Sequence, residues 1–252
     1  MKKLLFTLTL LGTMQLTQAQ SINDLLNKGK QILNGNTSTG QQGGSNGLGG
    51  NLGNNEIVNG LKEALKVGTQ NAAGKLNKTN GFFGNQLIKI LMPPELKNVE
   101  TTLRSFGFNK QCDNLIMSLN RAAEDASGKA VPIFVNAITS MNINDGLTIL
   151  RGGNNAATNF LRTSTTSALT QAFRPVIDKS LGKTGATQYW KDLFTVYNRL
   201  PITRNKVNTD LTGYVTERAL SGLFTTVAQE EANIRTNPAA RVNDILRNVF
   251  GG

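Results

Sequence analysis

Apolar residues recur every three or four positions through most of the chain beyond residue 55. The pattern is clearest in seven residues that would line one face of a first helix: Ile57, Leu61, Ala64, Leu65, Gly68, Ala72 and Leu76. This spacing is typical of a helix, whereas a half-buried strand would alternate apolar and polar side chains. Alternating segments are nearly absent. The sequence therefore predicts an all-α fold, with one compact domain of about ten helices over residues 56–252.

Proline and capping residues divide this pattern into helices. Met92-Pro93-Pro94 should end one helix and begin the next, because proline fits the first helical turn. Pro175 removes the hydrogen bond to the Gln171 carbonyl and predicts a kink or an end near Phe173. Asp210 can cap the helix that follows it. Asn237-Pro238 closes that helix and opens a last one with apolar residues between 242 and 250.

The strongest local signal lies at residues 142–155, between two of the predicted helices. Asn142 and Asp145 have the spacing of a capping box. Gly152 and Gly153 predict a left-handed stop of the helix before them, and Asn154 or Asn155 can cap the helix after them, which is the longest helix expected.

Small residues at Gly68 and Ala72, in the helix predicted from residue 57 to residue 76, indicate that another helix approaches it closely.

The first 55 residues have a different composition. Residues 1–19 resemble a cleavable signal peptide, with Lys2 and Lys3 before an apolar stretch and a small-residue site ending at Ala19. Residues 20–33 form a short amphipathic helix, and residues 34–55 form an uncharged linker rich in Gly and Asn. The leading helix either folds back on its own domain or binds a partner. No cysteine stands near the cleavage site to accept a lipid, and no later apolar stretch is long enough to span a membrane. We therefore expect a periplasmic or secreted protein that is neither a lipoprotein nor a membrane-spanning protein.

The charge narrows the class of partner. Without Lys2 and Lys3 the formal net charge of +11 falls to +9, which favours an anionic envelope component or an acidic protein. Residues 151–206 hold nine Lys and Arg against two Asp, so the excess is concentrated there. Nucleic acid is disfavoured as a partner, because the aromatic residues of this region have helical spacing and should lie in the core instead of stacking on bases.

The cysteine and histidine counts exclude several chemistries. The chain has one cysteine, Cys112, and no histidine. An intrachain disulfide, His-dependent catalytic triads and Cys/His zinc sites are therefore excluded, and we expect neither a metal nor a cofactor. Cys112 falls on an apolar helix face, which predicts a buried side chain and not a nucleophile.

Five motifs together resemble a known family: residues 81–96 (GFFGNQLIKILMPPEL), 120–126 (NRAAEDA), 149–153 (ILRGG), 214–224 (YVTERALSGLF) and 229–241 (QEEANIRTNPAAR). The chain is similar, over about residues 56–250, to the exported bacterial family called "domain of unknown function 4197". The resemblance implies a helical, secreted domain. It supplies no activity to carry over.

The first candidate site is the start of the helix after Gly153. Free backbone N–H groups and the positive end of that helix could bind an anion, with Arg151 and Arg162 nearby and Arg174 three turns further on. The hydroxyl groups between residues 163 and 170 would add donors. A purely structural helix corner is the alternative.

The second candidate is the pair Glu230 and Glu231, of which at least one should lie at the edge of a buried helix face. Arg235 can pair with Glu231, and Arg151, Arg174 or Arg241 could reach Glu230. These contacts would be a structural ion pair or part of a ligand site. Catalysis by Glu230 with Asp145 or Glu124 is a third interpretation.

These observations favour a non-catalytic, exported binding protein whose ligand-binding residues are Arg151, Arg162, Arg174, Glu230, Glu231 and Arg235. The alternative is a carboxylate-based hydrolase acting on cell-wall saccharide.

Overall fold

The computed structural model describes residues 53–197 and 210–237, which contain eight α-helices, one 3-10 helix and no strand. The predicted all-α class is confirmed, with slightly fewer helices than the ten expected. The leading helix predicted at residues 20–33 and the last helix predicted after Pro238 lie outside the described residues. The elements are α2 (Asn54–Leu76), η1 (Pro94–Leu96), α3 (Lys97–Ser105), α4 (Asn109–Ser127), α5 (Ala130–Ser140), α6 (Ile143–Arg151), α7 (Ala156–Lys183), α8 (Ala186–Tyr197) and α9 (Leu211–Thr236).

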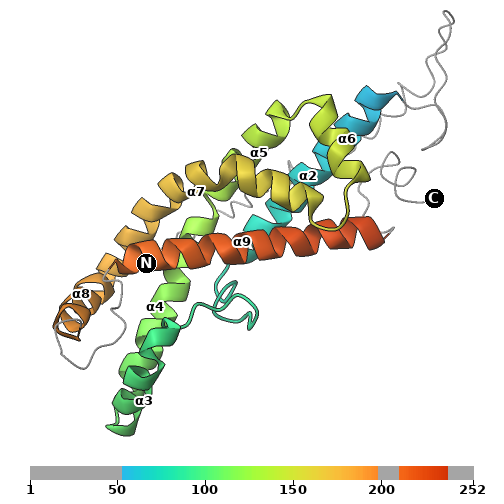
Figure 1. The fold of residues 1–252 in the computed structure, drawn as a ribbon. Helices are drawn as coiled ribbons and strands as arrows, with labels where there is room; N and C mark the ends of the chain where they lie inside the picture. The colour runs from blue at the N-terminus through green and yellow to red at the C-terminus, as the bar shows by residue number, and fades with distance from the viewer. Residues whose placement is uncertain (1–52, 198–209, 238–252) are drawn as a thin grey trace, which may run out of the picture. The chain divides into compact units, whose positions relative to one another are not determined.

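The chain divides into two compact units, residues 1–46 and 47–252, and every described residue belongs to the second. Within that unit α9 packs against α7 and α2, and α4 packs against α7. Figure 1 shows α7 and α9 as the two longest helices, running beside each other. The core of the unit forms where these helices meet, and it includes the edge-to-face pair Phe134 and Phe224, whose ring centroids lie 6.0 Å apart.

The buried face of α7 follows a strict four-residue repeat: Leu161, Thr165, Leu169, Phe173, Ile177 and Leu181. Each step of four residues advances about 40° beyond a full turn, so the buried stripe winds around the helix. The winding lets one long helix contact α5, α4, α9 and α8 along its length.

A kink or an end of α7 was predicted near Phe173, and the end is wrong, because the helix continues through Pro175 to Lys183. Pro175 and Gln171 are both exposed, so the carbonyl that lacks an N–H partner can bind water. Phe173 and Ile177 are buried on either side of the proline and stabilise the helix there.

The helix expected before Met92 is also absent, since residues 77–93 form turns and irregular backbone. Phe82 in this loop is fully buried and lies against Gly222 of α9. A Cβ on Gly222 would come within 2.5 Å of the Phe82 ring, so only glycine allows this approach. The loop therefore packs into the core through its side chains.

The close approach predicted at Gly68 is confirmed. A Cβ there would lie 3.3 Å from the Ile234 side chain and 3.8 Å from Glu230, both on α9. The small residues of α2 bring α9, and with it the Glu230–Glu231 pair, close to the α2 backbone.

Candidate functional site

The predicted capping box at the start of α6 is confirmed. The Asn142 side chain accepts a hydrogen bond from the Asp145 N–H at 2.8 Å, and the Asp145 carboxylate accepts one from the Asn142 N–H at 3.1 Å. The predicted left-handed glycine stop is wrong, because Gly152 is extended and the left-handed residue is Asn155, with φ 72°. Gly152 is needed for space instead, since a Cβ there would meet the Ala156 Cβ at 2.6 Å.

The start of α7 binds an anion, and that anion is the carboxylate of Glu231. Asn155 is the N-cap residue, but its side chain makes no capping bond. The Ala157 and Thr158 N–H groups donate instead to the Glu231 oxygens, at 3.1 and 2.9 Å, and the Thr158 hydroxyl donates at 2.8 Å. A negative charge is favourable at this end of a helix. The carboxylate of α9 therefore occupies the position where the sequence suggested an external ligand.

Arg235, one turn further along α9, binds the other side of the same corner. Its Nε donates to Glu231 at 3.0 Å, and its Nη atoms donate to the Ile149 and Gly152 carbonyls at 2.9 and 3.3 Å. These carbonyls belong to the C-terminal end of α6, where a positive charge is favourable. Glu231 thus places a negative charge at the start of α7, and Arg235 places a positive charge at the end of α6. We call these two residues of α9, with the helix ends that they bind, the corner lock.

The structure separates the remaining predicted arginines from this lock. Arg151 is exposed at the last position of α6. Arg162 lies over the Phe224 ring, 4.5 Å from its centroid. Arg174 pairs with Asp210 at 2.6 Å, so both Arg162 and Arg174 connect α7 to α9. Cation–π and exposed ion-pair contacts of this kind are each worth about 0.5–1 kcal/mol.

Four of the six hydroxyl groups between residues 163 and 170 bond within α7. Ser164, Thr165, Thr166 and Thr170 each donate to the carbonyl four residues earlier in the same helix. This i−4 bonding is common for Ser and Thr in helices. The protons of these four hydroxyls are therefore used inside the helix, and the two exposed ones, Thr163 and Ser167, stay predicted donors.

Glu230 is buried, and its partner is Lys75 of α2, not an arginine. The lysine side chain is 65% exposed while the carboxylate side chain is 9% exposed, so the pair lies at the boundary of the core. The structure thus brings Glu231 and Arg235 together and gives Glu230 and Arg174 separate partners.

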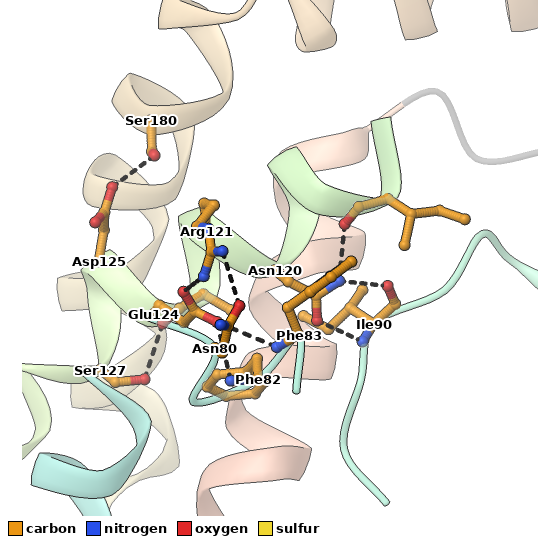
Figure 2. Close-up of polar contacts among 12 residues, drawn as sticks. Asn80, Phe82, Phe83, Ile90, Asn120, Arg121, Glu124, Asp125, Ser127 and Ser180 are labelled. Carbon is orange, nitrogen blue, oxygen red and sulfur yellow. Dashed lines mark hydrogen bonds and ion pairs between the residues drawn. The ribbon is translucent and has the colours of Figure 1, made fainter. Parts of the chain in front are cut away.

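A second buried carboxylate, Glu124 of α4, holds the loop at residues 77–93. Its Oε1 accepts hydrogen bonds from the Phe82 and Phe83 N–H groups at 3.0 and 3.1 Å. Its Oε2 pairs with Arg121 at 2.5 Å, and Arg121 also donates to the Asn80 side chain at 2.9 Å. Figure 2 shows these contacts converging on one carboxylate from the loop and from α4. Asn80 is left-handed, with φ 67°, at the turn into the loop.

One turn before Glu124, Asn120 holds the other end of the loop. Its Oδ1 accepts from the Ile90 N–H at 2.8 Å, and its Nδ2 donates to the Ile90 and Ile116 carbonyls at 2.8 Å (Figure 2). Asn120 is completely buried, and its two bonds to Ile90 supply partners for a backbone N–H and a carbonyl of the loop. The Tyr214 hydroxyl of α9 adds a bond to the Leu91 carbonyl at 2.8 Å.

Sequence reasoning considered Glu124 only as a partner in catalysis and did not select Asn120. The available signal was the position of two polar residues, Asn120 and Glu124, one turn apart on an otherwise apolar helix face. A buried polar side chain needs hydrogen-bond partners. The spacing could have shown that something binds there, but not that it is the loop at residues 77–93.

The cations of residues 151–206 face solvent wherever the structure describes their side chains. Six of the nine are described and all six are exposed: Arg151, Arg162, Arg174, Lys179, Lys183 and Lys191. Lys179 and Lys183, one turn apart on α7, line an open groove of about 540 Å³ together with Asp125 of α4. Asp125 accepts a hydrogen bond from Ser180 at 2.7 Å (Figure 2). Neither lysine forms an ion pair within the described chain.

The predicted burial of Cys112 is confirmed, and burial raises the pKa of its thiol. Phe173 and Trp190 are buried and Phe160 is partly buried, as expected for core aromatics. The side chains of Tyr189, Phe194 and Tyr197, which were also expected in the core, lie outside the described residues.

Two further properties concern metals and membranes. In the described parts of the chain, no group of three or more His, Cys, Asp or Glu residues is arranged to hold a metal ion. Among residues 53–197 and 210–237, no helix combines the length and apolar character that a membrane crossing requires.

Comparison with known proteins agrees with the resemblance in the five motifs. A family model described as "protein of unknown function (DUF4197)" matches residues 51–251. No curated protein and no solved structure matches the chain. The matched segment includes all the described residues, with the corner lock, the Asn120 and Glu124 contacts and the lysine groove. The chain therefore belongs to the DUF4197 family of proteins of unknown function.

Proposed function

We propose that this chain is an exported, non-catalytic protein that binds an anionic component of the cell envelope through the exposed cations of α6, α7 and α8. The observation that carries the proposal is the groove at Lys179 and Lys183. Two lysines without an ion-pair partner lie one turn apart beside an open hollow. Cations that the fold does not neutralise are available to a ligand, and a phosphate, sulfate or carboxylate group matches them.

The buried carboxylates support binding over hydrolysis. Glu231 accepts four hydrogen bonds at the corner lock, Glu124 holds the loop and Arg121, and Glu230 pairs with Lys75. A glycoside hydrolase needs two carboxyl groups that face a substrate across a gap. Each of these three carboxylates instead faces donors of its own chain, so the hydrolase alternative has less support.

The envelope as the site of action is supported by the amino-terminal sequence, with its basic start, apolar stretch and small-residue cleavage site. Export would bring the cations to phosphorylated or acidic polymers and to lipid headgroups. Arg162 and Arg174 also contact α9. The residues that can be changed without disturbing a helix contact are therefore Arg151, Lys179, Lys183 and Lys191.

The proposal is tested by retention of residues 20–252 on immobilised heparin against salt. We expect Lys179→Gln/Lys183→Gln to elute at lower salt than the wild type. Each cation that contacts a polyanion releases about one counterion. The slope of the logarithm of the binding constant against the logarithm of the salt concentration should therefore become less steep by about two.

Lys78→Gln/Lys97→Gln is the matched control, since it removes the same charge from two exposed lysines of other elements. The proposal requires that this control bind more tightly than the α7 variant. Equal elution of the two double variants would show that net charge alone governs binding, and the proposed site would be wrong.

A further inference from the structure

Exposed apolar side chains gather in one part of the described chain. Six large apolar side chains are exposed: Leu87, Leu91, Phe106, Phe108, Met117 and Ile143. Five of them lie between residues 87 and 117, in the loop at residues 77–93, the turn between α3 and α4, and the first half of α4. Single exposed apolar residues are ordinary on a soluble protein. Their concentration here, with Leu87 at 76% and Phe106 at 75% exposure, needs a physical reason.

Phe106 and Phe108 flank the turn between α3 and α4, which we call the hairpin tip (residues 106–108). Gly107 has φ 90°, a conformation that favours glycine. The Gly107 N–H donates to the Arg104 carbonyl and the Phe108 N–H to the Leu103 carbonyl, both at 3.0 Å. This pair of bonds is the Schellman arrangement that ends a helix. The backbone of the turn, from which both rings project, is therefore fixed by its own hydrogen bonds.

The hairpin tip is largely uncovered, with Phe106 75% and Phe108 45% exposed. α3 contains no buried residue, and its main contacts are with η1 and α4. In Figure 1 α3 lies along the end of α4 that extends away from α7 and α9. The tip is thus a convex projection that carries two aromatic rings.

A projecting tip of this size is better suited to a lipid bilayer than to a stable protein–protein interface. Each phenylalanine can bury roughly 150–250 Å². Two rings therefore supply well under the roughly 800 Å² per partner that a stable protein interface buries. The interface of a bilayer instead accepts a small apolar projection, because lipid chains rearrange around it.

One unpaired cation lies beside the rings. Lys110, in the first turn of α4, is exposed and has no acidic partner in the described residues. Arg104 is bound by both Glu100 and Asp113, at 2.7 and 2.8 Å, so these three side chains form their own ion-pair cluster and Lys110 is the cation next to the tip that remains available to a headgroup phosphate. Lysine beside exposed aromatic residues is typical of segments that rest on anionic membranes.

We propose that the hairpin tip inserts Phe106 and Phe108 into the interface of a bilayer that contains anionic phospholipid, with Lys110 at the headgroup phosphates. This surface differs from the cations of α6, α7 and α8, and the inference does not depend on them.

The test uses residues 20–252 and vesicles of phosphatidylcholine with about one third phosphatidylglycerol, in a flotation assay. Phe106→Ser/Phe108→Ser should lower the bound fraction about tenfold or more. The matched control is Leu87→Ser/Ile143→Ser, because its side chains are 76% and 44% exposed against 75% and 45% at the tip. We expect the control to bind like the wild type.

A second measurement reports the ring position directly. The chain has one tryptophan, Trp190, which is buried at 1% exposure, so Phe106→Trp adds a single accessible indole. Its emission should shift to shorter wavelength on addition of vesicles and should be quenched by brominated lipid, while the wild type changes little. Heparin retention of Phe106→Ser/Phe108→Ser should equal that of the wild type.

Two results would overturn the inference. One is that the tip variant and its control bind vesicles equally. This result would also include the case in which Lys179→Gln/Lys183→Gln reduces vesicle binding and the tip variant does not. The other is an unchanged Phe106→Trp spectrum with vesicles. Either result would leave the proposed heparin-binding site at α7 standing. A different result would reject the proposed function and leave this inference in place. In that case Lys179→Gln/Lys183→Gln would elute from heparin like its control, while the tip would still insert into vesicles.

Discussion

Glu231 shows how a single buried charge can hold three helices. Removing a carboxylate from water costs several kcal/mol unless donors and a cation replace the lost hydration. Glu231 obtains two backbone N–H groups, one hydroxyl group and the Arg235 guanidinium. Arg235 in turn binds two carbonyls of the α6 end. The backbone N–H groups at the start of α7 therefore stabilise the Glu231 charge, and the same hydrogen bonds hold the start of α7 against α9.

Glu231→Gln should destabilise the protein by about 3–5 kcal/mol, because the partly buried Arg235 would lose its counter-charge and an amide N–H₂ would face donors in a buried position. Urea unfolding followed by circular dichroism measures the change.

The control for this substitution is Glu217→Gln, an exposed position on the same helix, where we expect a change within about 0.5 kcal/mol. A loss below about 1 kcal/mol in Glu231→Gln would contradict the role of the carboxylate as a structural anion.

Asp210 gives the fold a small dependence on pH. Desolvation raises the pKa of its carboxyl group, but the Arg174 and Gly213 hydrogen bonds and the Arg174 charge outweigh this and lower it. A lowered pKa stabilises the fold above the unfolded value of about 3.9, and this contribution is lost as pH falls through the folded pKa. Both side chains of the pair are about half exposed, so the contribution is small, about 0.5 kcal/mol.

Asp210→Asn should therefore lower stability by about 0.5 kcal/mol at pH 7, because the amide oxygen can still cap α9 while the charge is lost. The difference from the wild type should disappear as pH falls below the lowered pKa of the Asp210 carboxyl group, because the side chain is then uncharged in both proteins. Urea midpoints from pH 7 down through the acid range measure it. An equal difference at both ends of the range would show that the capping bond, and not the charge, accounts for the effect.

At the scale of the elements, sequence pattern was sufficient where the decisive contacts are local. The Asn142 and Asp145 capping box and the Asp210 cap depend on neighbours three residues away, and both were predicted correctly. The loop at residues 77–93 was misjudged, because Asn120 and Glu124 satisfy its backbone from about 30 to 40 residues away. The same reason explains Asn155, whose capping role is taken over by Glu231.

The two contacts on the loop should be separable by amide hydrogen exchange. Glu124→Gln should reduce protection mainly at the Phe82 and Phe83 amides, and Asn120→Ala mainly at the Ile90 amide. The loss of a buried bond to a charged acceptor is worth about 1.5–3 kcal/mol, which corresponds to roughly a tenfold or greater change in exchange. If each variant exposed all three amides equally, the loop would open as one unit and the independent roles of Asn120 and Glu124 would be disproved.

At the scale of the whole described unit, charge is divided between interior and surface. Buried carboxylates hold the corner lock, the loop and the α2–α9 contact, while every described cation of residues 151–206 is exposed. The sequence predicted basic residues facing outward, and it left open whether the start of α7 binds an anion or is only a structural corner. It could not show that Glu231 is that anion, because the pairing joins residues more than 70 positions apart.

Our central claim is that the buried carboxylates bind donors of the chain itself, while the exposed cations bind the ligand. Nuclear magnetic resonance tests this claim most directly. Residues 20–252, labelled with ¹⁵N, are titrated with a short heparin oligosaccharide while the backbone amides are observed. We expect shifts around Lys179, Lys183 and Lys191, and none at the Ala157 and Thr158 amides, because Glu231 already occupies them. Saturable shifts at Ala157 and Thr158, with none around the three lysines, would contradict the account.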